Sequence, residues 1–472
     1  MNKRLISGAV ILSLVAGCAV GPKYRKPAVE SPSTFRGGAD ANGAAAATAS
    51  ASLGDLKWVE VFKDEQLQDL IRTALVNNYD LNQAMARIQT ARANLGIVKA
   101  DQFPEVTAGA GATTLRNSSS GQFALPSTSS RDRTFGSVVL NLLSFEIDVW
   151  GRVRRQKEAA RADLLNAEET RKAVMTTVVG DVSAAYFNLL ELDMELEIAK
   201  DTLKTRQASL NLVKTRQQGG VATMLDVRQA EQLVYAAAQT IPDIERLIEQ
   251  TENRINLLQG KEPGDVARGR SLTEQEQPPD VPAGLPSSLL ARRPDIRASE
   301  ATLMAATANI GVAKAAYFPQ ISLTGFMGGQ SNQLTSLFSG PAGAWNFAPQ
   351  LTLPIFNAGR VKSGVKFTEA QRQLALTQYQ QSIKNAFREV SDSLVEYRKV
   401  KEIRAQQEQL VTTLQDRSRL AYLRYQGGVD TQLNALDADR DLFAAELSLA
   451  QTRRNELLAL VQLYKALGGG WQ

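Results

Sequence analysis

The chain has 472 residues, a formal net charge of +5, 43% apolar and 6% aromatic residues, and no histidine. The missing histidine removes the usual general base, the Ser–His and Cys–His nucleophile pairs and the commonest metal ligand, so no catalytic residue, metal site or cofactor is expected. Pairs of carboxylates could still carry catalysis, but their helical spacing also suits surface ion pairs. The basic residues are interspersed with acidic ones, which favours a solvated helix surface over a nucleic-acid patch.

The N-terminus has the pattern of a secretory signal. Lys3 and Arg4 precede an apolar stretch over residues 5–16, which is too short to span a membrane. The only cysteine, Cys18, follows small residues, as the acylated residue of a bacterial lipoprotein does. A lone cysteine in an apolar leader could be incidental, but the spacing predicts that residues 1–17 are removed and that Cys18 is lipidated.

The residues after Cys18 predict an anchored tether. Ala19 rather than Asp follows the cysteine, which by resemblance to bacterial lipoprotein sorting rules indicates the outer membrane. Residues 18–57 are rich in Pro, Ser, Ala and Gly, so they have little to bury and are expected to be extended or loosely ordered.

The rest of the chain is a duplication. Residues 91–104 reappear as residues 306–319 with eight of fourteen positions identical, and later motifs repeat at an offset of 208. This period is too long for a solenoid, so we expect two packed half-molecules. The expected division is a first repeat over 58–270, a Pro-rich linker over 271–288, a second repeat over 289–468 and a tail over 469–472.

Each repeat contains a hairpin with a period of two, over residues 105–149 and 320–356. In the first, Glu146 and Asp148 are expected on a polar face. The apolar faces should carry Val139, Leu143, Phe145, Ile147 and Val149 in the first hairpin, and Phe347, Pro349, Leu351, Leu353 and Ile355 in the second. A soluble sandwich would show the same pattern, but strands of about ten residues also fit an outer-membrane barrel. Because four strands cannot close a barrel, a membrane-spanning chain must oligomerise.

Long helices follow the hairpins, over residues 151–217 and 359–425. Each could reach roughly 100 Å at about 1.5 Å per residue, and its apolar residues keep the three-four spacing of a coiled coil. A Gln-Gly-Gly-Val sequence ends each helix in a tight turn, and shorter amphipathic helices return over 221–260 and 429–467.

This arrangement resembles the outer membrane factor family, in particular the lipoprotein branch (OprM-like and NodT-type) of the TolC superfamily. The motifs that carry the resemblance are Trp58-(x)₃-Phe62, Ala93-Asn-Leu-Gly96, Phe103-Pro104, Asp148-(x)₂-Gly151-Arg152, Leu285-Pro-Ser-(x)-Leu-Leu-(x)-Arg-Arg-Pro-Asp-Ile296, Asn357-(x)-Gly-Arg360 and Leu463-Tyr-Lys-Ala-Leu-Gly-Gly-Gly-Trp471.

The resemblance implies an α+β membrane protein: a homotrimer with a 12-stranded outer-membrane β-barrel, four strands from each chain, continued by a 12-helix periplasmic α-barrel. Such proteins passively conduct solutes outward for an inner-membrane RND-type pump, through a periplasmic adaptor (membrane fusion protein). The expected partners are therefore these two proteins and outer-membrane lipid, and not nucleic acid.

The resemblance also implies sites at the periplasmic end. Relatives constrict this end around the second turn, and the matching positions are Arg424, Tyr425, Leu433 and Asp437, with Asp430 placed to face the tip. Arg–carboxylate links could hold the end shut and an apolar ring could dewet it, although helix capping or surface pairing would need the same residues. The adaptor is expected to contact the two turns, whose glycines could alternatively serve only to turn the chain: Gly219, Gly220, Val221, Gly427, Gly428 and Val429.

Three alternatives remain open. The same fold could serve a type I protein secretion system, although the lipidation pattern and the C-terminal motif favour efflux. A non-transporting coiled-coil lipoprotein would leave the amphipathic hairpins unexplained. An envelope hydrolase is disfavoured by the absence of histidine.

Overall fold

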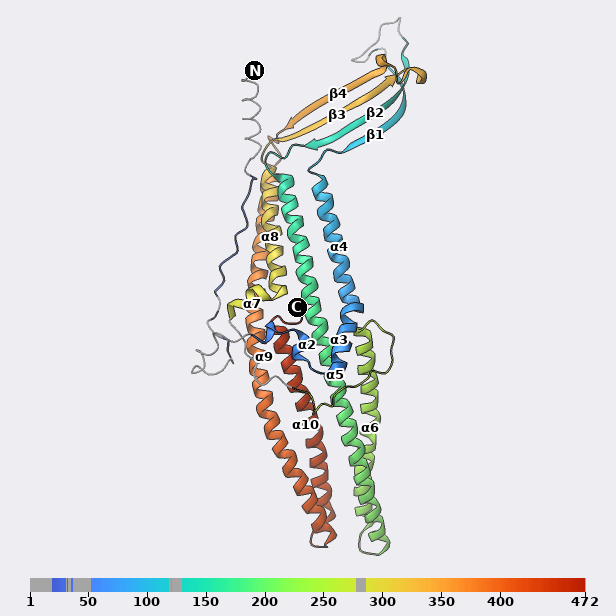
Figure 1. The fold of residues 1–472 in the computed structure, drawn as a ribbon, viewed down its shortest axis with the longest axis vertical. Helices are drawn as coiled ribbons and strands as arrows, with labels where there is room; N and C mark the ends of the chain where they lie inside the picture. Colours follow the sequence, from blue (N-terminus) through green and yellow to red (C-terminus); the bar gives the residue numbers. More distant parts are fainter. Residues whose placement is uncertain are drawn as a thin grey trace. The chain divides into compact units, whose positions relative to one another are not determined.

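The structure is a computed structural model that describes residues 19–30, 32, 35–36, 52–118, 120, 130–276 and 286–471, with the side chains of residues 286 and 287 left aside. The chain forms two compact units, whose helices and strands are labelled in Figure 1. Unit 1 comprises Met1–Ala28, Ile88–Ala167 and Ser299–Tyr379, and unit 2 comprises Val29–Arg87, Glu168–Ala298 and Gln380–Gln472.

Unit 1 contains an antiparallel sheet. In the described part of the chain four strands pair in sequence order: β1 (Val106–Arg116), β2 (Asp132–Glu146), β3 (Gln320–Ser331) and β4 (Gly343–Thr352). The short 3₁₀ helices η3 (Leu334–Ser336) and η4 (Gly340–Ala342) lie between β3 and β4. The pairing of β2 with β3 joins the two sequence repeats into one sheet.

The sheet has one apolar and one polar face. The register aligns Ala108, Leu140, Met327 and Trp345 across all four strands on the apolar face. The neighbouring row places Thr107, Asn141, Phe326 and Asn346 on the other face. Because directly paired residues point to the same side of a sheet, the four strands share these two surfaces.

One part of the expected strand pattern is wrong. Between Leu142 and Phe145 the pairing advances three residues on β2 and two on β3, so the alternation shifts at a β-bulge. Phe145, opposite Leu323, lies on the apolar face, whereas Val139, opposite Gly109 and Gly328, lies on the polar face. The bulge separates two residues that strict alternation had placed together.

The strands are also shorter than expected at one end. Ile147 and Val149 lie beyond β2, and Leu353 and Ile355 lie beyond β4. After β2, the Asp148 carboxylate accepts hydrogen bonds from the backbone N–H groups of Val153 and Arg154, at 3.1 and 2.9 Å. It thus satisfies free donors at the start of the next helix, which gives a physical reason for the Asp148-(x)₂-Gly151-Arg152 motif.

Four helices have residues in both units: α4 (Tyr79–Ala100), α5 (Arg152–Gln218), α8 (Pro294–Ala315) and α9 (Arg360–Gln426). The helices α5 and α9 begin and end one residue later than the sequence pattern suggests. Among the described residues, only α5 is long and apolar enough to cross a membrane, and most of its apolar window is buried in the protein.

Unit 2 is helical. Its other elements are η2 (Leu53–Asp55), α2 (Trp58–Val61), α3 (Glu65–Asn77), α6 (Met224–Leu258), α7 (Pro286–Arg292) and α10 (Gln432–Ala466). The first coiled coil packs α5 against α6 through Leu210, Val213 and Val227, and the second packs α9 against α10 through Val411, Ala445 and Leu449. Thr223 caps α6 by a reciprocal pair of hydrogen bonds with Asp226.

Candidate functional site

The two helical turns have the same backbone structure. Val221 N–H donates to the Arg216 carbonyl at 2.9 Å, and Val429 N–H donates to the Arg424 carbonyl at 3.1 Å. These bonds close the ends of α5 and α9 in the Schellman manner, with Gly220 and Gly428 at φ +76° and +72°. The side chains of Val221 and Val429 are 79% and 66% exposed. Both turns therefore present an exposed apolar side chain on a hydrogen-bonded tip.

The second turn brings together some of the residues that were predicted to close the periplasmic end. Arg424 Nε lies 3.0 Å from Asp430 Oδ2, and Asp430 Oδ1 accepts from Thr431 N–H and the Asn434 amide. These interactions, led by that with Arg424, hold the pKa of Asp430 below its usual value. Asp437 instead pairs with Arg440 on its own helix, at 3.2 Å. Within one chain, Arg424 and Asp437 are thus engaged with different partners.

Tyr425 and Leu433 differ in exposure. Tyr425 is buried beneath the Arg216 guanidinium, which lies 4.6 Å from the ring centroid. Arg216 also donates to the carbonyl oxygens of Tyr425 and Gln426, at 3.3 and 3.1 Å, and so caps the C-terminal end of α9. Leu433 is half exposed. The first coiled coil therefore holds the second through Arg216, which the sequence reasoning missed.

A second missed contact links the coiled coils further from the turns. Arg206 Nε on α5 lies 2.7 Å from Asp439 Oδ2 on α10, and these side chains are only 3% and 9% exposed. Arg206 also donates to the Leu233 carbonyl on α6, and its guanidinium lies 5.0 Å from the Phe443 ring centroid. The sequence did hold a signal, because Arg206 follows Leu203 and precedes Leu210 on the apolar seam of α5.

A third cluster contains buried carboxylates. Glu191 and Glu195 lie one turn apart on α5, both buried, with Arg454 Nη1 3.2 Å from Glu191 and Gln451 donating to Glu195 at 2.9 Å. Burial, followed by repulsion from Glu195, raises the pKa of Glu191 to about 8, against the opposing effect of Arg454. The pair therefore retains a proton at neutral pH.

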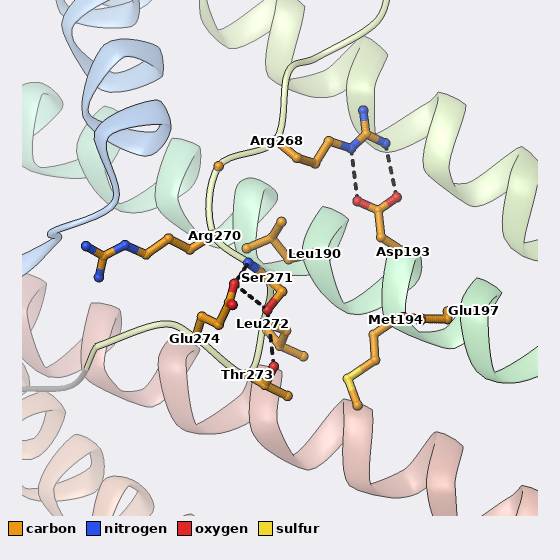
Figure 2. A pocket seen from close by; sticks show the side chains of 11 residues that line it. Leu190, Asp193, Met194, Glu197, Arg268, Arg270, Ser271, Leu272, Thr273 and Glu274 are labelled. Atoms are coloured by element: carbon orange, nitrogen blue, oxygen red, sulfur yellow. Dashed lines mark hydrogen bonds and ion pairs between the residues drawn. The ribbon is translucent and has the colours of Figure 1, made fainter.

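A pocket of about 420 Å³ lies between α5 and the loop after α6, and Figure 2 shows the side chains that line it. Arg268 Nε and Nη2 lie 2.9 and 3.1 Å from the two oxygens of Asp193, and Arg268 also bonds Glu252. Ser271 and Glu274 close the loop on itself. Asp193 and Arg268 pair across this pocket, which identifies them as a tie between the loop and α5. The described residues contain no metal-binding cluster of His, Cys, Asp and Glu.

The two-faced sheet and the paired coiled coils define a class of protein, the outer-membrane channels with long helical hairpins. The sequence profile described as outer membrane efflux protein matches residues 70–261 and 285–469. The chain belongs to this family, and the prediction of an outer-membrane efflux channel is confirmed.

Individual relatives match along almost the whole chain. The probable efflux pump outer membrane protein TtgC of Pseudomonas putida is 39% identical over 478 residues, with 100% of this chain and 96% of the relative covered. The cation efflux system protein CusC of Escherichia coli is 36% identical, with 99% of each chain covered. The solved structure of the outer-membrane channel OprN has a TM-score of 0.88 at 30% identity, covering 96% of this chain and 100% of that chain.

Proposed function

We propose that the chain is the exit duct of a tripartite efflux pump. In this proposal three chains form a 12-stranded barrel in the outer membrane and a 12-helix barrel in the periplasm. The assembly passively conducts drugs or other small molecules, which it receives from a periplasmic adaptor and an inner-membrane RND-type transporter. Because a passive duct need not bind its cargo, the transporter selects the substrate.

The observation that carries this proposal is the two-faced sheet with unpaired outer edges. Met327, Trp345, Phe347 and Leu351 stand exposed on the apolar face, as side chains that contact lipid do. In the described sheet β1 and β4 each pair with one strand only. Since an open edge is not stable in hydrocarbon, β4 of one copy must pair with β1 of the next until the barrel closes.

A gate at the periplasmic end, formed by residues around the second turn, is part of this proposal. Three copies of Arg424, Tyr425, Asp430, Leu433 and Asp437 would gather around the axis at the second turns. Arg424 and Asp437 are on the surface of one chain, so their side chains are available for links between chains. Changing both Arg424 and Asp437 to Ala should raise the leak of normally excluded solutes. The matched control is the exposed pair Arg419 and Asp416 on α9, whose double Ala variant should not leak.

Adaptor contact is proposed for the two turns. The exposed Val221 and Val429 would enter apolar positions on the adaptor. The backbone of the adaptor could approach the turns closely at their glycines, which are Gly219, Gly220, Gly427 and Gly428. The two turns have matching hydrogen bonds, so each chain would offer two similar docking sites. Val221→Asp and Val429→Asp should each weaken binding of the purified adaptor, and Val221→Ile should not.

The lipid anchor is proposed on Cys18, which lies outside the described residues. Acyl chains contribute about 0.8 kcal/mol for each buried methylene, so several chains would hold the N-terminus firmly in the outer membrane. Mass spectrometry of the N-terminal peptide tests this directly.

The experiment that tests the proposed function compares cells with and without the chain. Loss of the chain should raise accumulation of a fluorescent pump substrate, and the unmodified chain should restore efflux. Asn141→Arg, on the polar face, should restore it as well, whereas Leu140→Arg, on the apolar face, should not. Unchanged accumulation together with retention of a secreted protein would instead support the type I secretion alternative.

A further inference from the structure

The N-terminal segment, which was expected to be an extended or loosely ordered tether with little to bury, is docked on the helices. Val20 N–H donates to the Trp150 carbonyl at 3.0 Å. Arg155 on α5 donates through Nε to the Val20 carbonyl and through Nη2 to the Gly21 carbonyl, at 3.1 and 3.2 Å. The Arg155 side chain is only 5% exposed. A buried guanidinium thus donates two hydrogen bonds to the backbone of residues 20 and 21.

Two glycines make room for this backbone. A Cβ atom on Gly151 would lie 2.8 Å from the Ala19 Cα atom. A Cβ atom on Gly311, in α8, would lie 2.7 Å from the Val20 carbonyl oxygen and 2.8 Å from Arg155 Cγ. All three distances are shorter than normal contacts, so any side chain at either position must displace the segment or its arginine.

A carboxylate holds the segment further along. Glu300 on α8 is mostly buried and accepts from the Tyr24 hydroxyl at 2.9 Å and from Lys26 Nζ at 2.8 Å. Burial, followed by the hydrogen bond to Glu300, raises the pKa of Tyr24, so the phenol keeps its proton at physiological pH. Charge-assisted bonds at Glu300 and Arg155 therefore fix the segment at two points.

The duplication provides an internal comparison between the two repeats. The positions matching Gly151 and Gly311 are Gly359 and Gly96, and a Cβ atom on either would meet no atom within 4 Å in the described chain. The positions matching Arg155 and Glu300 are Ser363 and Met85. The repeats keep both glycines but differ at both charged residues that hold the segment, so it is the charged residues that distinguish the docked positions from their counterparts.

We propose that residues 19–30 form a strap, and that Gly151, Arg155, Glu300 and Gly311 are positioning residues that hold Ala19, the residue after the proposed lipidation site, beside the junction of β2 and α5. Ala19 lies against Gly151, five residues after the end of β2. Because Cys18 is bonded to Ala19, a docked strap would limit how far the acyl chains can lie from the end of β2. The role of the strap in anchoring rests on the proposed lipidation of Cys18, but docking of the strap can be tested without it.

The test is limited trypsin digestion of the full-length purified protein. Lys23 and Arg25 are both exposed, and cleavage after either one releases the N-terminal peptide. A protease can cut there only when the strap detaches from the residues that hold it. Gly311→Ala should speed this cleavage at least tenfold, and Arg155→Met should do the same. Gly96→Ala is the matched control: it adds the same methyl group to a helix at the equivalent position and should leave the rate unchanged.

The outcomes separate the claims. If all variants and the unmodified protein are cut equally fast, the strap is not docked and the inference is wrong. Equal resistance of Gly311→Ala and the unmodified protein would also contradict it, because docking of the strap would then not depend on Gly311. Unchanged single-channel conductance of each variant shows that it has folded and inserted. Mass spectrometry of the released peptide reports acylation of Cys18, so a failure of lipidation is seen apart from a failure of docking.

Discussion

Removing the Asp439 carboxylate should loosen the link between the two coiled coils of one chain. Asp439→Ala leaves the Arg206 cation 3% exposed and without its counter-ion. Breaking a buried ion pair from one side costs about 3–5 kcal/mol, because the remaining charge stays desolvated. Arg206 Nη2 already has no hydrogen-bond partner among the described residues, so this nitrogen makes no hydrogen bond that would offset the loss of the carboxylate.

The neighbouring ion pair supplies the control. Asp441 on the same helix pairs with Arg417 at 2.7 Å, but both side chains are well exposed, at 38% and 49%. Exposed pairs contribute about 0–1 kcal/mol because water and salt screen them. Asp441→Ala should therefore change the stability of the helices several times less than Asp439→Ala does, although the two residues lie within one turn.

Hydrogen exchange read by mass spectrometry measures the difference. A cost of about 3–5 kcal/mol at roughly 1.4 kcal/mol for each factor of ten lowers the protection of amides around residues 206 and 439 by about two to four orders of magnitude. The double variant Arg206→Met with Asp439→Leu removes both charges and should regain most of this protection. Equal protection in Asp439→Ala and Asp441→Ala would refute the reasoning.

Three further predictions follow from the geometry of single residues. Glu191 has a pKa raised to about 8, above its unfolded value, so its contribution to stability falls as pH rises from about 4.5 to about 8; thermal unfolding of Glu191→Gln should lose this slope, and an unchanged slope would contradict it. Gly428→Ala places a side chain at φ +72° and should weaken the second turn by about 1–2 kcal/mol, seen as faster exchange of the Val429 amide, whereas Gly364→Ala within α9 should stabilise the helix by about 0.5–1 kcal/mol. Leu140→Arg on the apolar face should lower the yield of inserted protein, at a cost of about 2–4 kcal/mol near the membrane midplane, and equal yields of Leu140→Arg and Asn141→Arg would show that the assigned faces are wrong.

Local sequence signals were sufficient for the helices and turns. The three-four spacing of α5 and the Gln-Gly-Gly-Val sequences locate both coiled coils, because periodicity and a positive φ are local properties. The face on which each strand residue lies was harder to predict from the sequence. The bulge near Leu142 depends on how β2 pairs with β3, which lies far away in the sequence, and so it moved Phe145 to the face opposite Val139.

The contacts between distant segments were not predictable in this way. Arg206 on an apolar seam was a visible anomaly, but its partner Asp439 lies 233 residues away. The strap was predicted to be part of an extended or loosely ordered tether because its composition offers little apolar surface. Its docking uses backbone carbonyls and the absence of side chains at Gly151 and Gly311, and neither feature leaves a hydrophobic pattern in the sequence.

The central claim is that copies of this chain enclose a conducting pore. Planar-bilayer conductance of the purified protein, with its mass measured in the same detergent, tests that claim most directly. The account predicts a trimer with discrete channels that grow larger when Arg424 and Asp437 are both changed to Ala. A monomer without conductance would contradict it and would support a non-transporting coiled-coil lipoprotein.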